Sequence, residues 1–92
     1  MQQIFKQAVD TFGRDNQTNM AIEELAELIV VINHWRRGRV GNVAVIEEIA
    51  DCYIMLRQLT YIVTDASDSS PIIPLIERKI ARLNRRIAEW QQ

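Results

Sequence analysis

Residues 21–32 read AIEELAELIVVI, and this stretch combines two patterns that decide the fold. Its apolar residues recur at three- and four-residue spacing, which predicts a single stripe along an α-helix. That stripe consists of Ile22, Leu25, Ile29 and Ile32. The glutamates between these residues also follow helical spacing. We therefore expect a helix over about residues 19–37 that buries one apolar stripe in the core and carries an acidic face.

Helical spacing continues on both sides of this stretch, and no segment alternates with period two for long enough to predict a strand. Three further helices are predicted, over residues 3–12, over residues 43–63, and from the prolines at 71 and 74 to about residue 90. Both prolines suit a helix start. The sequence therefore predicts an all-α fold with four helices.

The connections between these helices are polar or rich in glycine. Residues 14–18 are expected to form a polar turn in which Asn16 and Thr18 are candidate N-caps. Residues 38–42 are expected to form a loop, with Asn42 suited to cap the helix that follows. Residues 64–70 read as a polar linker.

The last two helices carry apolar stripes of their own. In the third helix one side holds Ile46, Ile49, Tyr53, Leu56 and Thr60. In the last helix the steps are 4, 3, 4 and 3, which is an a/d seam for packing against another helix, formed by Ile76, Ile80, Leu83, Ile87 and Trp90. We therefore predict a compact four-helix bundle.

Composition places the chain among small globular domains, since 48% of its 92 residues are apolar. We expect one domain over residues 1–92. The net charge of −1 does not favour a polyanionic partner or sequence-specific nucleic-acid binding.

The single Cys52 is interpreted as packing and suits a reducing compartment. The longest apolar run, residues 28–32, is too short to cross a bilayer, and no signal peptide is visible. A cytoplasmic protein is expected. Because four short helices bury little apolar surface, a homodimer or homotetramer is expected as well.

Two acidic clusters carry the candidate chemistry: Glu23, Glu24 and Glu27 in the second helix, then Glu48 and Asp51 in the third. Glu24 and Glu27 share a helix face, and Glu48 and Asp51 repeat the same spacing on the next helix. A short loop makes these helices antiparallel neighbours, so the two faces can meet. Converging carboxylates repel unless a cation lies between them, and an all-oxygen site favours Mg²⁺ or Mn²⁺. The alternative interpretation is two solvated acidic faces paired with arginines.

The expected loop does not by itself place the two acidic clusters at the same height along the helices. Counted outward from Val40, Glu27 and Glu24 lie 13 and 16 residues away, whereas Glu48 and Asp51 lie 8 and 11 residues away. This is a stagger of about five residues, or roughly 7.5 Å along the helices. An uneven loop, helix tilt or the length of the glutamate side chains must absorb it.

The pattern Glu-Glu-x-x-Glu, 20 residues, then Glu-x-x-Asp resembles the signature of MazG-like nucleotide pyrophosphohydrolases, which include dimeric dUTPases and dCTP pyrophosphatases. The flanking residues are similar over about residues 12–88. The resemblance implies a four-helix, MazG-type fold that forms dimers or tetramers. It also implies Mg²⁺-dependent hydrolysis of nucleoside triphosphates to monophosphate and pyrophosphate, in a nucleotide-pool house-cleaning role. It places the metal ligands at Glu24, Glu27, Glu48 and Asp51, with Glu23 as a second-shell residue, a ligand for another metal or a water-orienting base.

Five basic residues follow helical spacing near the end of the chain: Arg78, Lys79, Arg82, Arg85 and Arg86. Lys79, Arg82 and Arg86 are candidate phosphate contacts, and the alternative is the solvated side of an amphipathic helix. Gln17 is a candidate contact to a base or sugar, or a plain turn residue. Trp35 is a candidate for base stacking, or a packing anchor.

Three other functions compete with this one, and one of them, an incomplete enzyme whose base-recognition elements come from a partner subunit, is compatible with catalysis. A di-iron bundle needs Glu-x-x-His pairs, and the only histidine, His34, follows Val31 at that spacing. The sequence therefore excludes it. A catalytically inactive oligomerisation or regulatory module remains the alternative to an enzyme.

Overall fold

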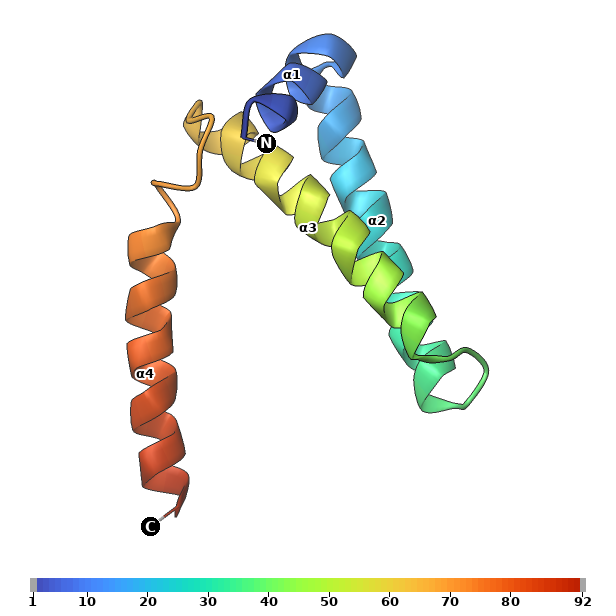
Figure 1. The fold of residues 1–92 in the computed structure, drawn as a ribbon, viewed down its shortest axis with the longest axis vertical. Coiled ribbons are helices and arrows are strands. Elements are labelled where there is room, and N and C mark those ends of the chain that lie inside the picture. Colours follow the sequence, from blue (N-terminus) through green and yellow to red (C-terminus); the bar gives the residue numbers. More distant parts are fainter. Residues whose placement is uncertain (1, 92) are drawn as a thin grey trace.

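The computed structural model describes residues 2–91 and is entirely helical within them, so the all-α prediction is confirmed. The helices are α1 (Gln2–Phe12), α2 (Arg14–Arg36), α3 (Asn42–Thr64) and α4 (Ile73–Gln91) (Figure 1). Helices α2 and α3 form an antiparallel hairpin, α1 packs against both of them at the open end, and α4 stands apart. Among these helices, none combines the length and apolar character needed to cross a membrane.

The second helix begins earlier than predicted, because the expected polar turn over residues 14–18 is wrong. Helix α2 starts at Arg14, directly after Gly13, whose positive φ of 97° makes the sharp bend from α1. Asn16 and Thr18 are not caps. Each donates a side-chain hydrogen bond to the carbonyl four residues earlier, at 2.9 and 2.8 Å. Such bonds let polar residues lie inside a helix, so this segment continues as helix.

A tight glycine turn ends α2. Gly38 takes the left-handed conformation, with φ 73°. Its N–H donates to the carbonyl of Trp35 at 3.0 Å, and the N–H of Arg39 donates to the carbonyl of His34 at 2.9 Å. These two bonds form a Schellman motif, which satisfies carbonyls at the helix end and reverses the chain within a few residues.

The predicted cap at the start of α3 has a different role. The N-cap residue is Gly41, and no side chain caps the helix. Asn42 is already helical, and its Oδ1 accepts a hydrogen bond of 2.7 Å from Nε1 of Trp35. This bond joins the two helices of the hairpin beside the turn.

The core is small and lies where α1 covers the open end of the hairpin. Its buried apolar residues are Phe5, Val9, Ala21, Cys52, Met55 and Tyr61. It also contains one buried polar pair, in which Nε2 of Gln17 donates to Oε1 of Gln58 at 2.7 Å. A buried amide pair is tolerated because each partner satisfies the other.

The predicted core stripe of α2 is wrong. Ile22 and Ile29 are 61% and 63% exposed, because α2 turns a different side toward α3. That side carries Gln17 and Ala21, whose small or hydrogen-bonded side chains allow close approach of the two helices. The predicted stripe of α3 is exposed as well, with Ile46 at 62%. Residues of similar hydrophobicity occupy both sides of these helices, so periodicity alone did not select the buried one.

The four helices do not close into the compact bundle that we predicted. Within residues 2–91, α4 packs against none of the other three helices. The radius of gyration is 16.2 Å, whereas a compact domain of this length has a radius of roughly 12 Å. Figure 1 shows the resulting arch, with the hairpin as one arm and α4 as the other.

We predict that Gln17→Leu lowers the free energy of unfolding by about 1–3 kcal/mol, because Oε1 of Gln58 is then buried without a donor. The double variant Gln17→Leu/Gln58→Leu should recover much of this loss, since it removes both polar groups. Urea unfolding followed by circular dichroism measures both. Strictly additive losses in the double variant would contradict the paired amides.

Candidate metal centre

The register of the hairpin brings the two acidic clusters level. Three cross-hairpin contacts, Gln17–Gln58, Glu24–Cys52 and Trp35–Asn42, are each centred on Gly38 to within one residue. The stagger counted from Val40 therefore used the wrong centre. Counted from Gly38, Glu27 and Glu24 lie 11 and 14 residues before the turn, and Glu48 and Asp51 lie 10 and 13 residues after it.

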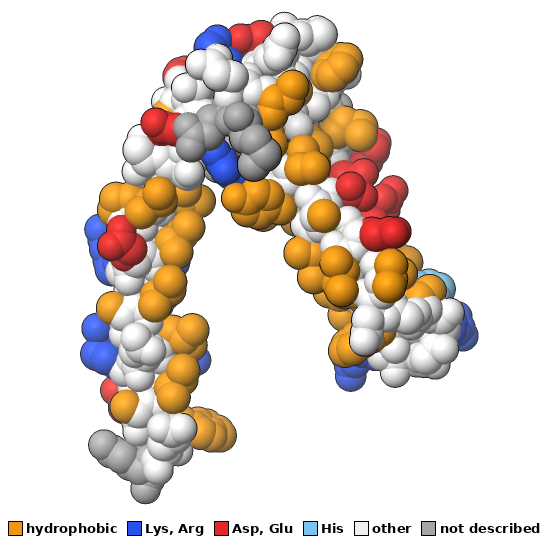
Figure 2. All heavy atoms as spheres, viewed as in Figure 1, with side chains coloured by type: hydrophobic (Ala, Val, Ile, Leu, Met, Phe, Trp, Pro, Cys, Tyr) orange, Lys and Arg blue, Asp and Glu red, His pale blue; other side chains and the backbone are white. Residues whose placement is uncertain are grey.

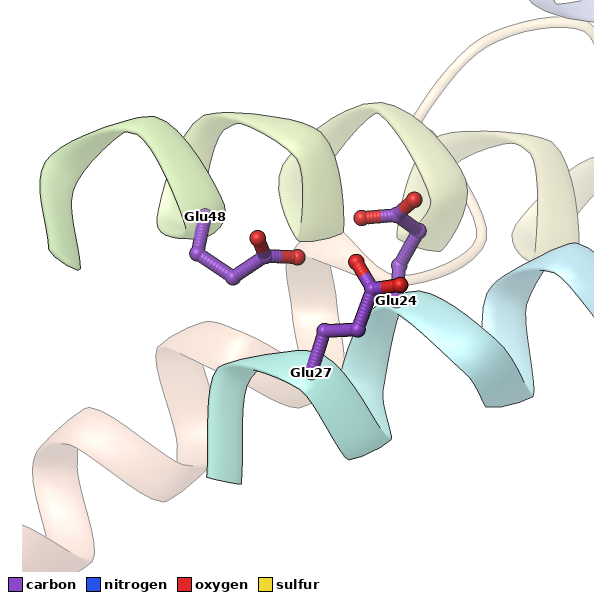
Figure 3. A group of neighbouring side chains, drawn as sticks. All are labelled: Glu24, Glu27 and Glu48. Atoms are coloured by element: carbon purple, nitrogen blue, oxygen red, sulfur yellow. The ribbon is translucent and has the colours of Figure 1, made fainter. Parts of the chain in front are cut away.

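Three carboxylates meet at this level. Each of Glu24, Glu27 and Glu48 offers one oxygen, and these oxygens lie within 4.8 Å of one another. Glu24 and Glu27 extend from α2 and Glu48 from α3, with their carboxylates directed toward one another (Figure 3). Glu24 and Glu48 are half-buried, and Glu27 is exposed. No other group of this kind occurs among residues 2–91.

Two oxygens of this cluster are covered without a partner. Among the described residues, no donor bonds Oε2 of Glu24 or Oε1 of Glu48, although both atoms are shielded from solvent. The pKa of Glu24 is raised, first because its carboxyl can share a proton with that of Glu48. Loss of hydration on burial and repulsion from Glu48, Asp51 and Glu23 raise it further. The site therefore stabilises a positive charge, supplied by a proton or a cation.

The two remaining predicted site carboxylates lie beside the cluster. Asp51 and Glu23 are exposed and are not part of the mutual 4.8 Å group. Both are near enough to raise the pKa of Glu24 through their charge. The structure therefore places all five predicted acidic residues around one point and brings three of them into close approach.

Cys52 is buried next to these carboxylates. Its thiol is 3% exposed and donates to the carbonyl of Glu24 at 3.2 Å. Burial raises the pKa of this thiol, and the neighbouring carboxylates, led by Glu48, raise it further. Burial and a raised thiol pKa both disfavour a nucleophile or a metal ligand at this position, which agrees with its interpretation as packing.

The donor set fits a hard divalent cation. Mg²⁺ takes six oxygen ligands at about 2.0–2.1 Å and usually keeps several waters. Three protein carboxylates, two with an oxygen that has no donor, leave positions for water and for the oxygens of a bound phosphate. The absence of nitrogen and sulfur ligands disfavours zinc and copper at this point.

The residues predicted to bind substrate lie in three different places. Gln17 is buried in the hairpin and bonded to Gln58, and Trp35 is 45% exposed beside the turn. Lys79, Arg82 and Arg86 are exposed on α4, which does not contact the hairpin. One copy of the chain therefore does not bring them to the carboxylates, and their contact with substrate stays a prediction.

Sequence reasoning missed the partner of Gln17. Gln58 lies on the side of α3 that also carries Met55 and Cys52, three and six residues earlier, and all three are buried. That spacing could have identified it as an inward-facing polar residue in need of a partner.

Comparison of the chain with protein families, curated proteins and solved structures found no match. The functional argument therefore rests on the spacing of the carboxylates and on the geometry that the hairpin gives them.

The raised pKa of Glu24 predicts a pH dependence of stability. In the unfolded chain the Glu24 carboxyl loses its proton around its ordinary pKa of 4.5, whereas in the metal-free fold it keeps the proton to a higher pH. The free energy of unfolding therefore falls as the pH rises from 4.5 to the raised pKa of the folded state. Mn²⁺ should restore this stability above that window. Thermal unfolding of wild type and Glu24→Gln, with and without Mn²⁺, measures both effects.

Glu47→Gln is the matched control, because Glu47 is an exposed neighbour outside the cluster. It should keep the wild-type response to pH and to Mn²⁺, whereas Glu24→Gln should lose most of both. A wild-type melting temperature that Mn²⁺ leaves unchanged at neutral pH would contradict the site.

Proposed function

We propose that this chain is a MazG-like pyrophosphohydrolase that hydrolyses (deoxy)nucleoside triphosphates to monophosphate and pyrophosphate with Mg²⁺. The observation that carries the proposal is the approach of Glu24, Glu27 and Glu48 within 4.8 Å, on two helices whose register is fixed independently by the turn at Gly38. A set of oxygen ligands that leaves coordination positions open suits a triphosphate, whose own oxygens complete the sphere.

Each carboxylate has a role in this proposal. Glu24, Glu27 and Glu48 would hold the cation, and Asp51, one helical turn after Glu48, would complete the set. The bound ion would acidify water and neutralise charge on the leaving pyrophosphate. Glu23 is exposed and next to Glu24, so it can accept a proton from the attacking water.

The proposal also uses the basic side of α4. Among the described residues, Arg78, Lys79, Arg82, Arg85 and Arg86 form no ion pair or hydrogen bond with another side chain. Unpaired arginines and lysines are suited to phosphate oxygens. Helix α4 does not pack against its own hairpin. Its basic side chains can therefore reach a triphosphate at the carboxylates only if α4 moves onto this hairpin or packs on the hairpin of another copy.

The second candidate function is a catalytically inactive oligomerisation or regulatory module. It is supported by the apolar stripes that α2, α3 and α4 leave exposed. These stripes serve self-association whether or not the chain is an enzyme. Catalysis therefore has to be tested through the carboxylates rather than through association.

We expect the purified protein with Mg²⁺ to release pyrophosphate from one or more members of a panel of canonical and damaged nucleoside triphosphates. Glu48→Gln should lower kcat/KM by at least about 100-fold, because it removes charge that stabilises the transition state through the cation. Glu47→Gln makes the same chemical change one residue away and should retain activity. Pyrophosphate release, measured with an excess of substrate, compares the three proteins.

Two results would count against this function. Absence of product above background for every nucleotide would leave the inactive module as the better account. Equal activity in wild type and Glu48→Gln would mean that the reaction occurs elsewhere on the chain.

A further inference from the structure

The isolated chain exposes more surface than a folded monomer of its size. Its accessible area is 7148 Å² for a mass of 10.7 kDa. A compact monomer of this mass exposes roughly 5,500 Å². The excess is therefore roughly 1,600 Å², which matches the area that each partner buries in an obligate dimer, about 1,000–2,500 Å².

The excess surface includes one apolar face of the hairpin. Ile22 and Ile29 on α2, and Ile46, Ile49 and Tyr53 on α3, are each more than half exposed. At 100° per residue, both stripes lie roughly a third of a turn or more from the contact between the antiparallel helices, on the side opposite the exposed acidic residues. Figure 2 shows these two sides, with apolar atoms facing the interior of the arch and acidic atoms on the outside.

The seam of α4 forms the other apolar face of the arch. Its residues Ile76, Ile80, Leu83 and Ile87 are 45–53% exposed. Figure 2 shows apolar atoms along the side of the α4 arm that faces the hairpin across open space. The beginning of α4 is held, because the N–H groups of Ile72 and Ile73 donate to the carbonyl of Ser69 at 3.1 and 3.2 Å.

The first turn of α4 borders a small pocket that α3 also borders. Ile73 and Ile76 line the same small pocket as Tyr53 and Leu56 of α3. From this pocket the helix runs away from α3 at an angle (Figure 1), and its seam packs against no other helix among residues 2–91. The apolar seam of α4 is therefore exposed and accessible to a molecule that binds between the two arms.

The two arms carry opposite charge. Helix α4 has five basic and two acidic side chains, a formal charge of +3. Helices α2 and α3 together have three basic and seven acidic side chains, a formal charge of −4 with His34 neutral. A hairpin from another copy therefore attracts α4, and this attraction weakens as salt is added.

We propose that a second copy of this chain inserts its hairpin between the arms, so that each α4 seam covers the apolar hairpin face of the other copy. Three observations support a second copy as the molecule between the arms. Both arms have an exposed apolar side, the single chain exposes more area than a compact monomer, and α4 and the hairpin helices carry opposite charges. The acidic residues remain on the outer sides of the hairpins. The arrangement is independent of the proposed catalysis, since neither metal nor substrate takes part in it.

Sedimentation velocity of the full chain tests this interface. Wild type should sediment as a dimer, or as a tetramer built from such dimers, at micromolar concentration. Ile80→Glu on α4 and Ile49→Glu on α3 should each sediment as monomers. Both residues are half-exposed in the single chain, so the circular dichroism of the α2–α3 hairpin should persist. Ala81→Glu, an exposed change on the other side of α4, should still associate.

Amide hydrogen exchange distinguishes this arrangement from other contacts. Since α4 does not touch its own hairpin, Ile49→Glu should increase exchange in α4 only if that helix docks on the hairpin of another copy. Loss of α4 protection in this variant supports the exchange of α4 between copies. A monomeric wild type, an assembly that survives Ile80→Glu, or unchanged α4 exchange in Ile49→Glu would overturn it. A monomeric wild type that still releases pyrophosphate would leave the proposed function standing.

Discussion

The register of the α2–α3 hairpin is the constraint on which the rest of the structure depends. It is set by the Schellman turn at Gly38, whose positive φ lets the chain reverse directly after α2. One residue added to α2 before this turn would rotate its upstream part by about 100° relative to α3. The oxygens of Glu24 and Glu27 would then no longer meet Glu48, and Gln17 would no longer meet Gln58. The meeting of the carboxylates, the buried polar pair and the apolar face all follow from one turn.

Repulsion between the acidic residues of the hairpin destabilises the fold, and only a small core opposes it. This core contains only a few fully buried side chains, of which Val9 is the most completely enclosed. Such a chain is marginally stable. A bound cation would remove the repulsion, and a docked copy would add buried apolar area. Each would stabilise the fold by mass action, because it would bind the folded state and not the unfolded one.

Much of this arrangement could be predicted from the sequence, because helical periodicity is a local property. The four helices, the glycine turn and the two acidic clusters were recognised from spacing alone. Periodicity shows that Ile22 and Ile29 share a side, but not which neighbour covers that side. The prediction places the stripe of Ile22 and Ile29 in the core, whereas close helix approach selects the side of Ala21 and Gln17. The compact bundle failed for the same reason, since that prediction assumed that one chain covers all of its own stripes.

The position of the carboxylates explains how one small hairpin can combine an ion site with an interface. Antiparallel helices leave two free sides, and here Glu23 and Glu27 occupy one while Ile22 and Ile29 occupy the other. Packing on the apolar side therefore leaves the acidic side open to water, ions and phosphates. The basic side chains of α4 lie away from its apolar seam, so docking through that seam would leave them exposed as well. Association in this form would therefore leave both the acidic and the basic surfaces free to bind other groups.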